Sequence, residues 1–120
     1  MKKRRILIAE DYLDNFLLLE AILREYPYEL IHVEDGAQAM EAVNNDEFDL
    51  LLIDVQMPIM NGLDFIKKYR ETNNETPAIA QTAHAFDIDR KECLEAGFTD
   101  YISKPINKKS LIDLLHKYLS

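Results

Sequence analysis

The sequence predicts an α/β domain in which a parallel sheet carries helices on both faces. Short apolar runs alternate with amphipathic stretches five times along the 120 residues, and the connections between them are short. The third run, residues 50–53, is apolar throughout, which is typical of a strand covered on both faces. No linker or low-complexity segment divides the chain, so we expect one domain over residues 1–120.

Five apolar runs are predicted to be strands because each recurs between stretches with helical periodicity. A strand that is followed by a helix and then by another strand favours parallel pairing. The predicted strands are residues 6–9, 30–33, 50–53, 78–80 and 101–102.

The segment after the first strand predicts a helix with one apolar face. Asp14 can cap this helix. At 100° per residue, Leu17 lies opposite the apolar face and Phe16 lies on its flank, so both are expected to be partly exposed. The residues expected to face the core are Leu18, Leu19, Ile22, Leu23 and Tyr26.

Four more helices follow from the spacing of apolar residues. Gly36 opens the second helix, and Gly62 precedes the third. The fourth is predicted over residues 87–96, where Gly97 suits a left-handed stop. The last helix carries Leu111, Leu114, Leu115 and Tyr118 at helical spacing.

The composition excludes several classes of function. A formal net charge of -8 repels polyanions, so we expect no direct nucleic-acid role; the basic residues 2–5 are interpreted as a solvated tether before a strand. The only cysteine, Cys93, allows no intramolecular disulfide and is expected to be a buried small hydrophobe. No apolar run approaches the ~20 residues that span a bilayer, so we expect a cytoplasmic protein without membrane insertion.

The polar residues that interrupt the pattern all follow predicted strands. Glu10 and Asp11 end the first strand, Asp54 ends the third, Thr82 ends the fourth, and Lys104 follows the fifth. Ligands of such sheets bind at the carboxyl ends of the strands. The sequence therefore predicts that three carboxylates, a hydroxyl and an ammonium meet at one edge.

Three adjacent carboxylates repel one another unless a cation neutralises them or their pKa values rise. Magnesium prefers hard oxygen ligands and commonly keeps several waters beside one or two carboxylates, so it suits this set. Asp54 is then a candidate nucleophile that forms an aspartyl phosphate. Lys104 could pair with Asp54 and later with a phosphoryl oxygen, and a cis bond to Pro105 would aim its ammonium inward. Thr82 offers a hydroxyl donor to the same group.

Each of these residues also has an ordinary interpretation when it is taken alone. The pair Glu10 and Asp11 is then an acidic turn, Asp54 is a cap or loop aspartate, and Thr82 is a strand former. Only their combination favours a functional site.

That combination resembles the response-regulator receiver family over essentially the whole chain. The implied fold is flavodoxin-like, a five-stranded parallel sheet of order 2-1-3-4-5 with five helices. The motifs that carry the resemblance are ILIAED (residues 6–11), LLIDVQMPIMNG (51–62), TAHA (82–85) and YISKPI (101–106). Departures are modest: Glu10 stands where many members have aspartate, and Tyr12 where a small polar residue is common.

The resemblance implies a role for each matching residue. Asp54 is the phosphoacceptor, Lys104 binds the phosphoryl group, and Thr82 with Tyr101 forms a switch pair. A magnesium ion is implied with Asp11 as a direct ligand, Glu10 as a ligand through water, Asp54, and the backbone carbonyl of Gln56.

The resemblance also implies partners and a signal lifetime. The phosphoryl donor is a histidine kinase or a histidine phosphotransfer protein, and the output passes to a downstream protein effector. Gln56 and His84 flank the route of the water that attacks the acyl phosphate, although His84 is equally interpretable as a solvated loop residue. Phe16 and Leu17 lie beside the acidic edge and are candidates for docking the donor, the alternative being ordinary surface.

Two other functions compete with this interpretation. Haloacid-dehalogenase-like phosphatases also use an aspartate nucleophile with magnesium, but they carry a second aspartate two residues later, where this chain has Gln56. A constitutive interaction module would not need phosphorylation, and the complete set of site residues argues against it. We expect a phosphoacceptor signalling domain and not an enzyme that turns over a substrate.

Overall fold

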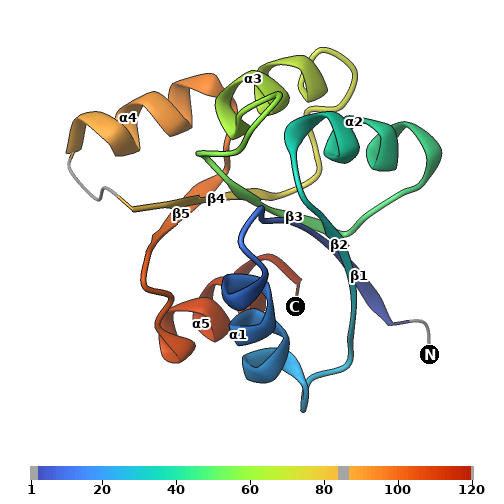
Figure 1. Cartoon of the computed structure of the whole chain (residues 1–120), viewed down its shortest axis with the longest axis vertical. Helices are drawn as coiled ribbons and strands as arrows, with labels where there is room; N and C mark the ends of the chain where they lie inside the picture. Colours follow the sequence, from blue (N-terminus) through green and yellow to red (C-terminus); the bar gives the residue numbers. More distant parts are fainter. Residues whose placement is uncertain (1–2, 84–86, 120) are drawn as a thin grey trace.

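A twisted parallel sheet lies between two layers of helices (Figure 1). The computed structural model describes residues 3–83 and 87–119, and side chains in the second range are described from residue 90 on. The strand order is β2-β1-β3-β4-β5, and every neighbouring pair is parallel, which confirms the predicted topology. The strands are β1 (Arg4–Ala9), β2 (Tyr28–Val33), β3 (Leu50–Asp54), β4 (Ala78–Thr82) and β5 (Asp100–Ser103).

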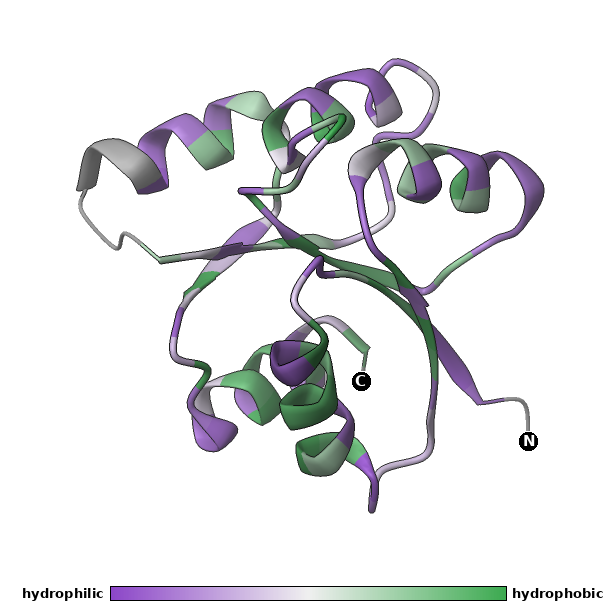
Figure 2. Ribbon diagram, viewed as in Figure 1, coloured by the Kyte–Doolittle hydropathy of each residue, from purple (hydrophilic) through white to green (hydrophobic). Residues whose placement is uncertain are grey.

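Helices cover both faces of the sheet, with α1 and α5 on one side and α2, α3 and α4 on the other (Figure 1). Their bounds are α1 (Leu13–Leu23), α2 (Gly36–Asn45), α3 (Gly62–Tyr69), α4 (Asp87–Ala96) and α5 (Lys108–Leu119). Because strand side chains alternate, Ile6 and Ile8 face the α1/α5 core whereas Leu7 and Ala9 face the α2–α4 core. In Figure 2, the central part of the sheet is mostly hydrophobic ribbon, whereas the start of β1 next to the N-terminus is hydrophilic. No helix in the described part of the chain is long and apolar enough to cross a membrane.

Helix α1 differs from its prediction in two respects. It begins after Tyr12, and Asp14 lies in its first turn, so the predicted Asp14 cap is wrong. Leu18 is 45% exposed, whereas the predicted face had it buried. The helix face that packs inward consists of Phe16, Leu19, Ile22 and Leu23, and Tyr26 packs beside it from the turn after the helix. Most of α1 is apolar (Figure 2), so its sequence fits more than one inward face, and tertiary packing selects one.

Side chains and glycines fix the remaining helix ends. The Asp35 carboxylate accepts a hydrogen bond from the Gln38 backbone N–H at 2.8 Å and begins α2. Gly97 follows α4 with a φ of 129°, which confirms the predicted glycine stop. Cys93 is buried on the α2–α4 side, as expected.

The loop between β3 and α3 is held at both ends by glycines. The Gly36 N–H donates to the Met60 carbonyl, and the Gly62 N–H donates to the Val55 carbonyl, each at 2.9 Å. A Cβ atom at position 62 would lie 2.4 Å from the Asp54 carbonyl oxygen. The backbone around Asp54 is therefore packed against α3 at a distance that only glycine permits.

Candidate functional site

Three carboxylates meet at the carboxyl edge of the sheet. Oxygen atoms of Glu10, Asp11 and Asp54 all lie within 4.8 Å of one another. Asp54 is the last residue of β3, and Glu10 follows β1, the neighbouring strand, so the sheet itself brings the two together. Glu10 and Asp54 are buried, whereas Asp11 is exposed. The cluster thus has a buried floor and one carboxylate toward solvent.

Lys104 reaches into this cluster from beyond β5. Its Nζ donates to Asp54 Oδ2 at 2.6 Å and lies 2.9 Å from Glu10 Oε1. The Lys104 backbone N–H donates to the Thr82 carbonyl at 2.8 Å, which anchors the chain where β5 ends. The Lys104–Pro105 peptide bond is cis. The predicted pairing of Lys104 with Asp54 is confirmed, and Glu10 shares the same ammonium.

The electrostatics of the cluster favour an additional cation. Burial, together with the neighbouring Asp54 carboxylate, raises the pKa of Glu10 from 4.5 to about 7, although Lys104 opposes the rise. Burial lowers the pKa of Lys104, but its hydrogen bonds to Asp54 and Glu10 outweigh that effect and the net shift is upward. Three carboxylates beside one ammonium leave two negative charges unbalanced when all are ionised. A divalent cation with oxygen ligands fits this donor set.

Backbone groups hold the two buried carboxylates in place. The Gln56 N–H donates to Asp54 Oδ1 at 3.0 Å, and the Tyr12 N–H donates to Glu10 Oε2 at 3.2 Å. A hollow of about 610 Å³ opens beside Asp11 and is lined by the loop after β3. Its remaining lining residues are Val55, Gln56, Met57, Pro58, Asn61 and Leu63. An incoming group therefore has room next to the exposed carboxylate.

The two predicted switch residues lie on neighbouring strands. Thr82 ends β4 and is almost fully buried. Tyr101 in β5 is half-buried, pairs in register with Ala80, and packs against the α2–α4 core. Side chains at positions 80 and 82 share a face because strand residues alternate, so Thr82 and Tyr101 face the same layer. The Arg90 guanidinium lies 4.9 Å from the centre of the Tyr101 ring.

The response regulator receiver domain family matches residues 6–116. The chain belongs to this family. Receivers of this family act in phosphoryl transfer, as domains of response regulators and of hybrid histidine kinases.

Relatives of both kinds resemble this receiver. The receiver domain of sensor histidine kinase PA1611 from Pseudomonas aeruginosa PAO1 was crystallised with magnesium coordinated in its active site cleft. It is 33% identical with a TM-score of 0.89, over 98% of each chain. The sensor protein GacS of Pseudomonas syringae is 35% identical over 95% of this receiver and 13% of GacS. CpxR of Escherichia coli is 39% identical over 90% of this receiver and 46% of CpxR. The receiver thus spans less than half the length of these last two relatives.

The two predicted docking residues have different environments in this receiver. Leu17 is 46% exposed, as expected, and Leu13 one turn earlier is 57% exposed. Phe16 is only half-exposed, because its ring stacks on His32 with centroids 4.0 Å apart. The His32 Nε2 lies 2.9 Å from the Glu10 carbonyl oxygen, so Phe16 supports the strand that carries the site. The predicted tuning residue His84 lies outside the described residues.

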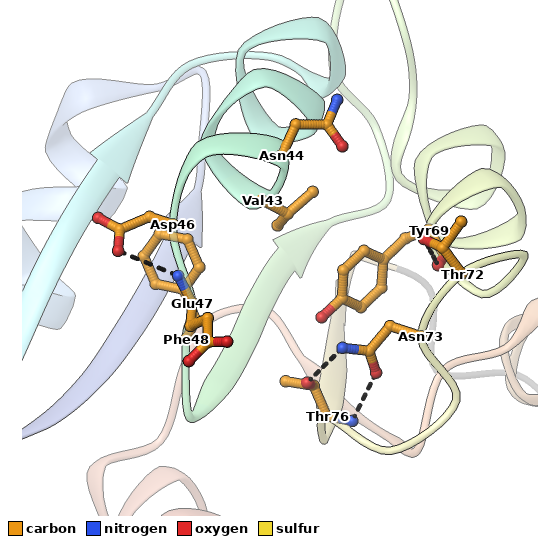
Figure 3. A pocket seen from close by; sticks show the side chains of 9 residues that line it. All are labelled: Val43, Asn44, Asp46, Glu47, Phe48, Tyr69, Thr72, Asn73 and Thr76. Atoms are coloured by element: carbon orange, nitrogen blue, oxygen red, sulfur yellow. Dashed lines mark hydrogen bonds between the residues drawn. The ribbon is translucent and has the colours of Figure 1, made fainter.

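A second cleft, of about 410 Å³, lies at the opposite edge of the sheet (Figure 3). Loops that precede β3 and β4 line it, with the Tyr69 ring beside Asn73 and Thr76. The Asn73 amide donates to Thr76 Oγ1 at 3.1 Å, so part of its polar lining is internally bonded. Since Asp54 ends β3, this cleft is a full strand length from the carboxylates and is separate from the receiver site.

Sequence reasoning missed Gln81, a fully buried residue beside Asp54. Gln81 pairs in register with Asp54 within the β3–β4 ladder. The sequence predicts the fourth strand over residues 78–80 and places Thr82 at its end, but it gives Gln81 between them no role. The signal that could have found it is the regular alternation itself, which continues through Gln81 to Thr82.

Proposed function

We propose that this receiver accepts a phosphoryl group on Asp54 from a phosphohistidine, in a magnesium-dependent reaction. The observation that carries the proposal is the ammonium of Lys104, held 2.6 Å from a buried Asp54 carboxylate within an acidic cluster. A structural ion pair alone does not need two further carboxylates beside it. A site that transfers a phosphoryl group does, because the carboxylates can hold a divalent cation, and that cation would neutralise charge on the phosphoryl oxygens.

The chain's own groups suit each part of the transfer. An Asp54 carboxylate oxygen attacks phosphorus, the P–N bond to the donor histidine breaks, and the electron pair of that bond leaves with the imidazole. The Lys104 ammonium, which already donates a hydrogen bond to Asp54, would then donate to an oxygen of the transferred phosphoryl group. Bound magnesium would supply further charge neutralisation, and the groups suited to hold it are Glu10, Asp11, Asp54 and the Gln56 backbone carbonyl. The magnesium ion in the active site cleft of the PA1611 receiver supports the choice of metal.

Phosphorylation is then read by Thr82 and Tyr101. The Thr82 hydroxyl would move toward the phosphoryl group, and Tyr101 would turn into the space that it leaves. Because Tyr101 is half-buried under Arg90, its movement changes the α4–β5 surface that a downstream protein can contact. Gln56 and His84 are proposed to set the rate at which water removes the group. The receiver acts on its own acyl phosphate and not on a separate substrate.

The donor of the phosphoryl group is proposed to be a histidine kinase or a histidine phosphotransfer protein. A relative supports this proposal, since PA1611 is a sensor histidine kinase whose receiver domain is similar to this one. Phosphotransfer rates measured with a set of candidate donors would identify the cognate one as the donor that phosphorylates this receiver fastest.

Mass spectrometry after incubation with acetyl phosphate tests the acceptor. The wild-type receiver is expected to gain one phosphoryl group, to require magnesium for it, and to lose it under mild base. Asp54→Asn is expected to stay folded and unmodified. A variant that gains a labile phosphoryl group at the wild-type rate would show that the acceptor is another residue.

A further inference from the structure

Three buried polar side chains form a row across neighbouring strands. Leu52 and Ile79 both pack in the α1/α5 core, so Asp54 and Gln81, two residues further along β3 and β4, lie on that same face. Glu10 follows β1 with the same alternation. Gln81 is therefore the third member of the row that contains the two buried carboxylates of the site.

Gln81 carries a buried amide near the end of β4. Its side chain is fully buried, and neither its oxygen nor its nitrogen has a hydrogen-bond partner among residues 3–83 and 90–119. An unpaired buried amide is costly, and an aliphatic side chain would fill the same strand position without that cost. The acceptor and the two donors of this amide are thus buried beside the site and suited to a further partner.

The topology directs the Lys104 side chain across the end of β4, the strand that carries Gln81. Since β4 lies between β3 and β5, a lysine that follows β5 and contacts Asp54 on β3 must extend across the end of β4. Gln81 lies at that end, on the face that also holds Ile102, two residues before Lys104. Gln81 is accordingly on the strand that the Lys104 side chain crosses on its way to Asp54.

Metal binding would create the need for a new partner of Lys104. The ammonium has three N–H donors, and its two ionic partners, Glu10 and Asp54, belong to the carboxylate set that suits a divalent cation. When those oxygens turn toward a cation, the ammonium, on a side chain that is only 20% exposed, loses acceptors. The Gln81 carbonyl oxygen is an uncharged acceptor within the same buried row.

We infer that Gln81 is a positioning residue, whose side-chain oxygen accepts a hydrogen bond from Lys104 when magnesium occupies the carboxylates. It thereby keeps the ammonium aimed at the phosphoryl position. This inference rests on the proposed function, because it assumes that the cluster binds magnesium.

Calorimetric titration of magnesium into four proteins tests this inference: the wild type, Gln81→Met, Lys104→Met and the double variant. Methionine keeps the length of the side chain and removes its hydrogen bonding. Gln81→Met is expected to weaken magnesium binding about tenfold, the lower range for one hydrogen bond to a charged group. In the Lys104→Met background, the same change is expected to leave the affinity unaltered.

A purely structural role gives a different pattern. Equal weakening in both backgrounds, or none in either, would overturn the inference and leave Gln81 as a packing residue. A wild-type receiver without magnesium affinity would instead overturn the proposed function. Ile79→Val is the matched control, because Ile79 lies two residues before Gln81 on the same face of β4 and the change removes one methylene group. The magnesium affinity of this variant is expected to equal that of the wild type.

Nuclear magnetic resonance provides a second test that does not depend on how well Gln81→Met folds. Magnesium is expected to shift the side-chain amide signals of Gln81 in the wild type but not in Lys104→Met. Signals that stay fixed in the wild type during saturation would overturn the inference.

Discussion

The Lys104 ammonium is bonded to an Asp54 carboxylate 50 residues earlier in the chain and contacts Glu10 as well. One ammonium therefore contacts two buried carboxylates, of which Asp54 ends β3 and Glu10 follows β1. The same ammonium is therefore within reach of any group that binds to Asp54.

Lys104→Met is expected to lower both stability and reactivity. It leaves Glu10 and Asp54 as adjacent buried carboxylates without a counter-ion, and breaking a partly buried pair costs about 2–4 kcal/mol. Chemical denaturation in chelator measures the loss, and acetyl phosphate gives the phosphorylation rate, which is expected to fall at least about tenfold. Lys91→Met is the control: its pair with Glu95 is exposed and 3.9 Å long, so stability is expected to change by less than about 0.5 kcal/mol. An equal loss in both variants would contradict the buried-pair argument.

The raised pKa of Glu10 predicts an unusual dependence of stability on pH. The Glu10 carboxyl has a pKa near 4.5 in the unfolded chain and of about 7 in the folded chain, so the folded chain binds its proton more tightly. The free energy of unfolding therefore decreases as pH rises from 4.5 to 7. In magnesium-free buffer, the contribution of Glu10 is therefore largest below pH 4.5, falls between 4.5 and 7, and is level above 7. Denaturation of wild type and Glu10→Gln across this range measures the difference, which is expected to grow in favour of Glu10→Gln with pH. A constant difference would show that the Glu10 pKa is not raised.

Gly62→Ala is expected to disturb the acceptor through its backbone. The added methyl group would meet the Asp54 carbonyl oxygen at 2.4 Å and the Val55 Cα at 3.0 Å, so the loop after β3 must shift. Overpacking of this kind costs about 1–3 kcal/mol, and phosphorylation is expected to slow because Asp54 moves with the loop. Gly97→Ala is the matched control. Gly97 has a φ of 129°, so any side chain there strains the backbone, and the residue lies away from the carboxylate cluster. This variant should lose stability while the folded protein is phosphorylated at the normal rate; slowing in both variants would indicate general instability.

Much of the site could be predicted because topology leaves its residues little freedom. In a parallel sheet, a residue that ends one strand lies beside the residue that ends its neighbour, so Glu10 and Asp54 had to meet. Lys104 was harder to place, since only its position after the last strand directs it to the same edge. Its second partner, Glu10, follows from side-chain geometry that no spacing reveals.

The errors arise where local sequence permits more than one arrangement. Helix α1 is apolar on several sides, and its inward face is decided by Phe16 stacking on His32 from β2, a contact that the helical pattern does not contain. Exclusion of Leu18 from the core follows from that choice. Gln81 was missed for a related reason, because a polar residue at the end of a strand resembles a loop until its pairing with Asp54 is known.

The corrected face of α1 changes the prediction for docking of the phosphoryl donor. Leu13 and Leu17 are one helical turn apart and exposed, and they lie on the helix that directly follows Glu10 and Asp11. A donor histidine must approach Asp54 past this helix, so an apolar contact here would hold the complex. Leu13→Ala with Leu17→Ala is expected to slow transfer from a phosphorylated partner protein about five- to tenfold, since truncating an interface residue commonly costs about 1–2 kcal/mol. Transfer from acetyl phosphate is expected to stay at the wild-type rate.

Phe16→Ala separates packing from docking on the same helix. Its loss removes the ring stacked on His32, so it is expected to lower stability by more than about 1 kcal/mol, whereas Leu17→Ala is expected to change stability by less than about 0.5 kcal/mol. Leu94→Ala serves as the control for exposed leucines, since Leu94 is 47% exposed on α4, across the sheet from α1. If Leu94→Ala slows protein-to-protein transfer as much as the α1 variant, the effect belongs to surface apolarity in general. If the α1 variant also slows transfer from acetyl phosphate, the damage lies in the acceptor site, because a small donor needs no docking helix.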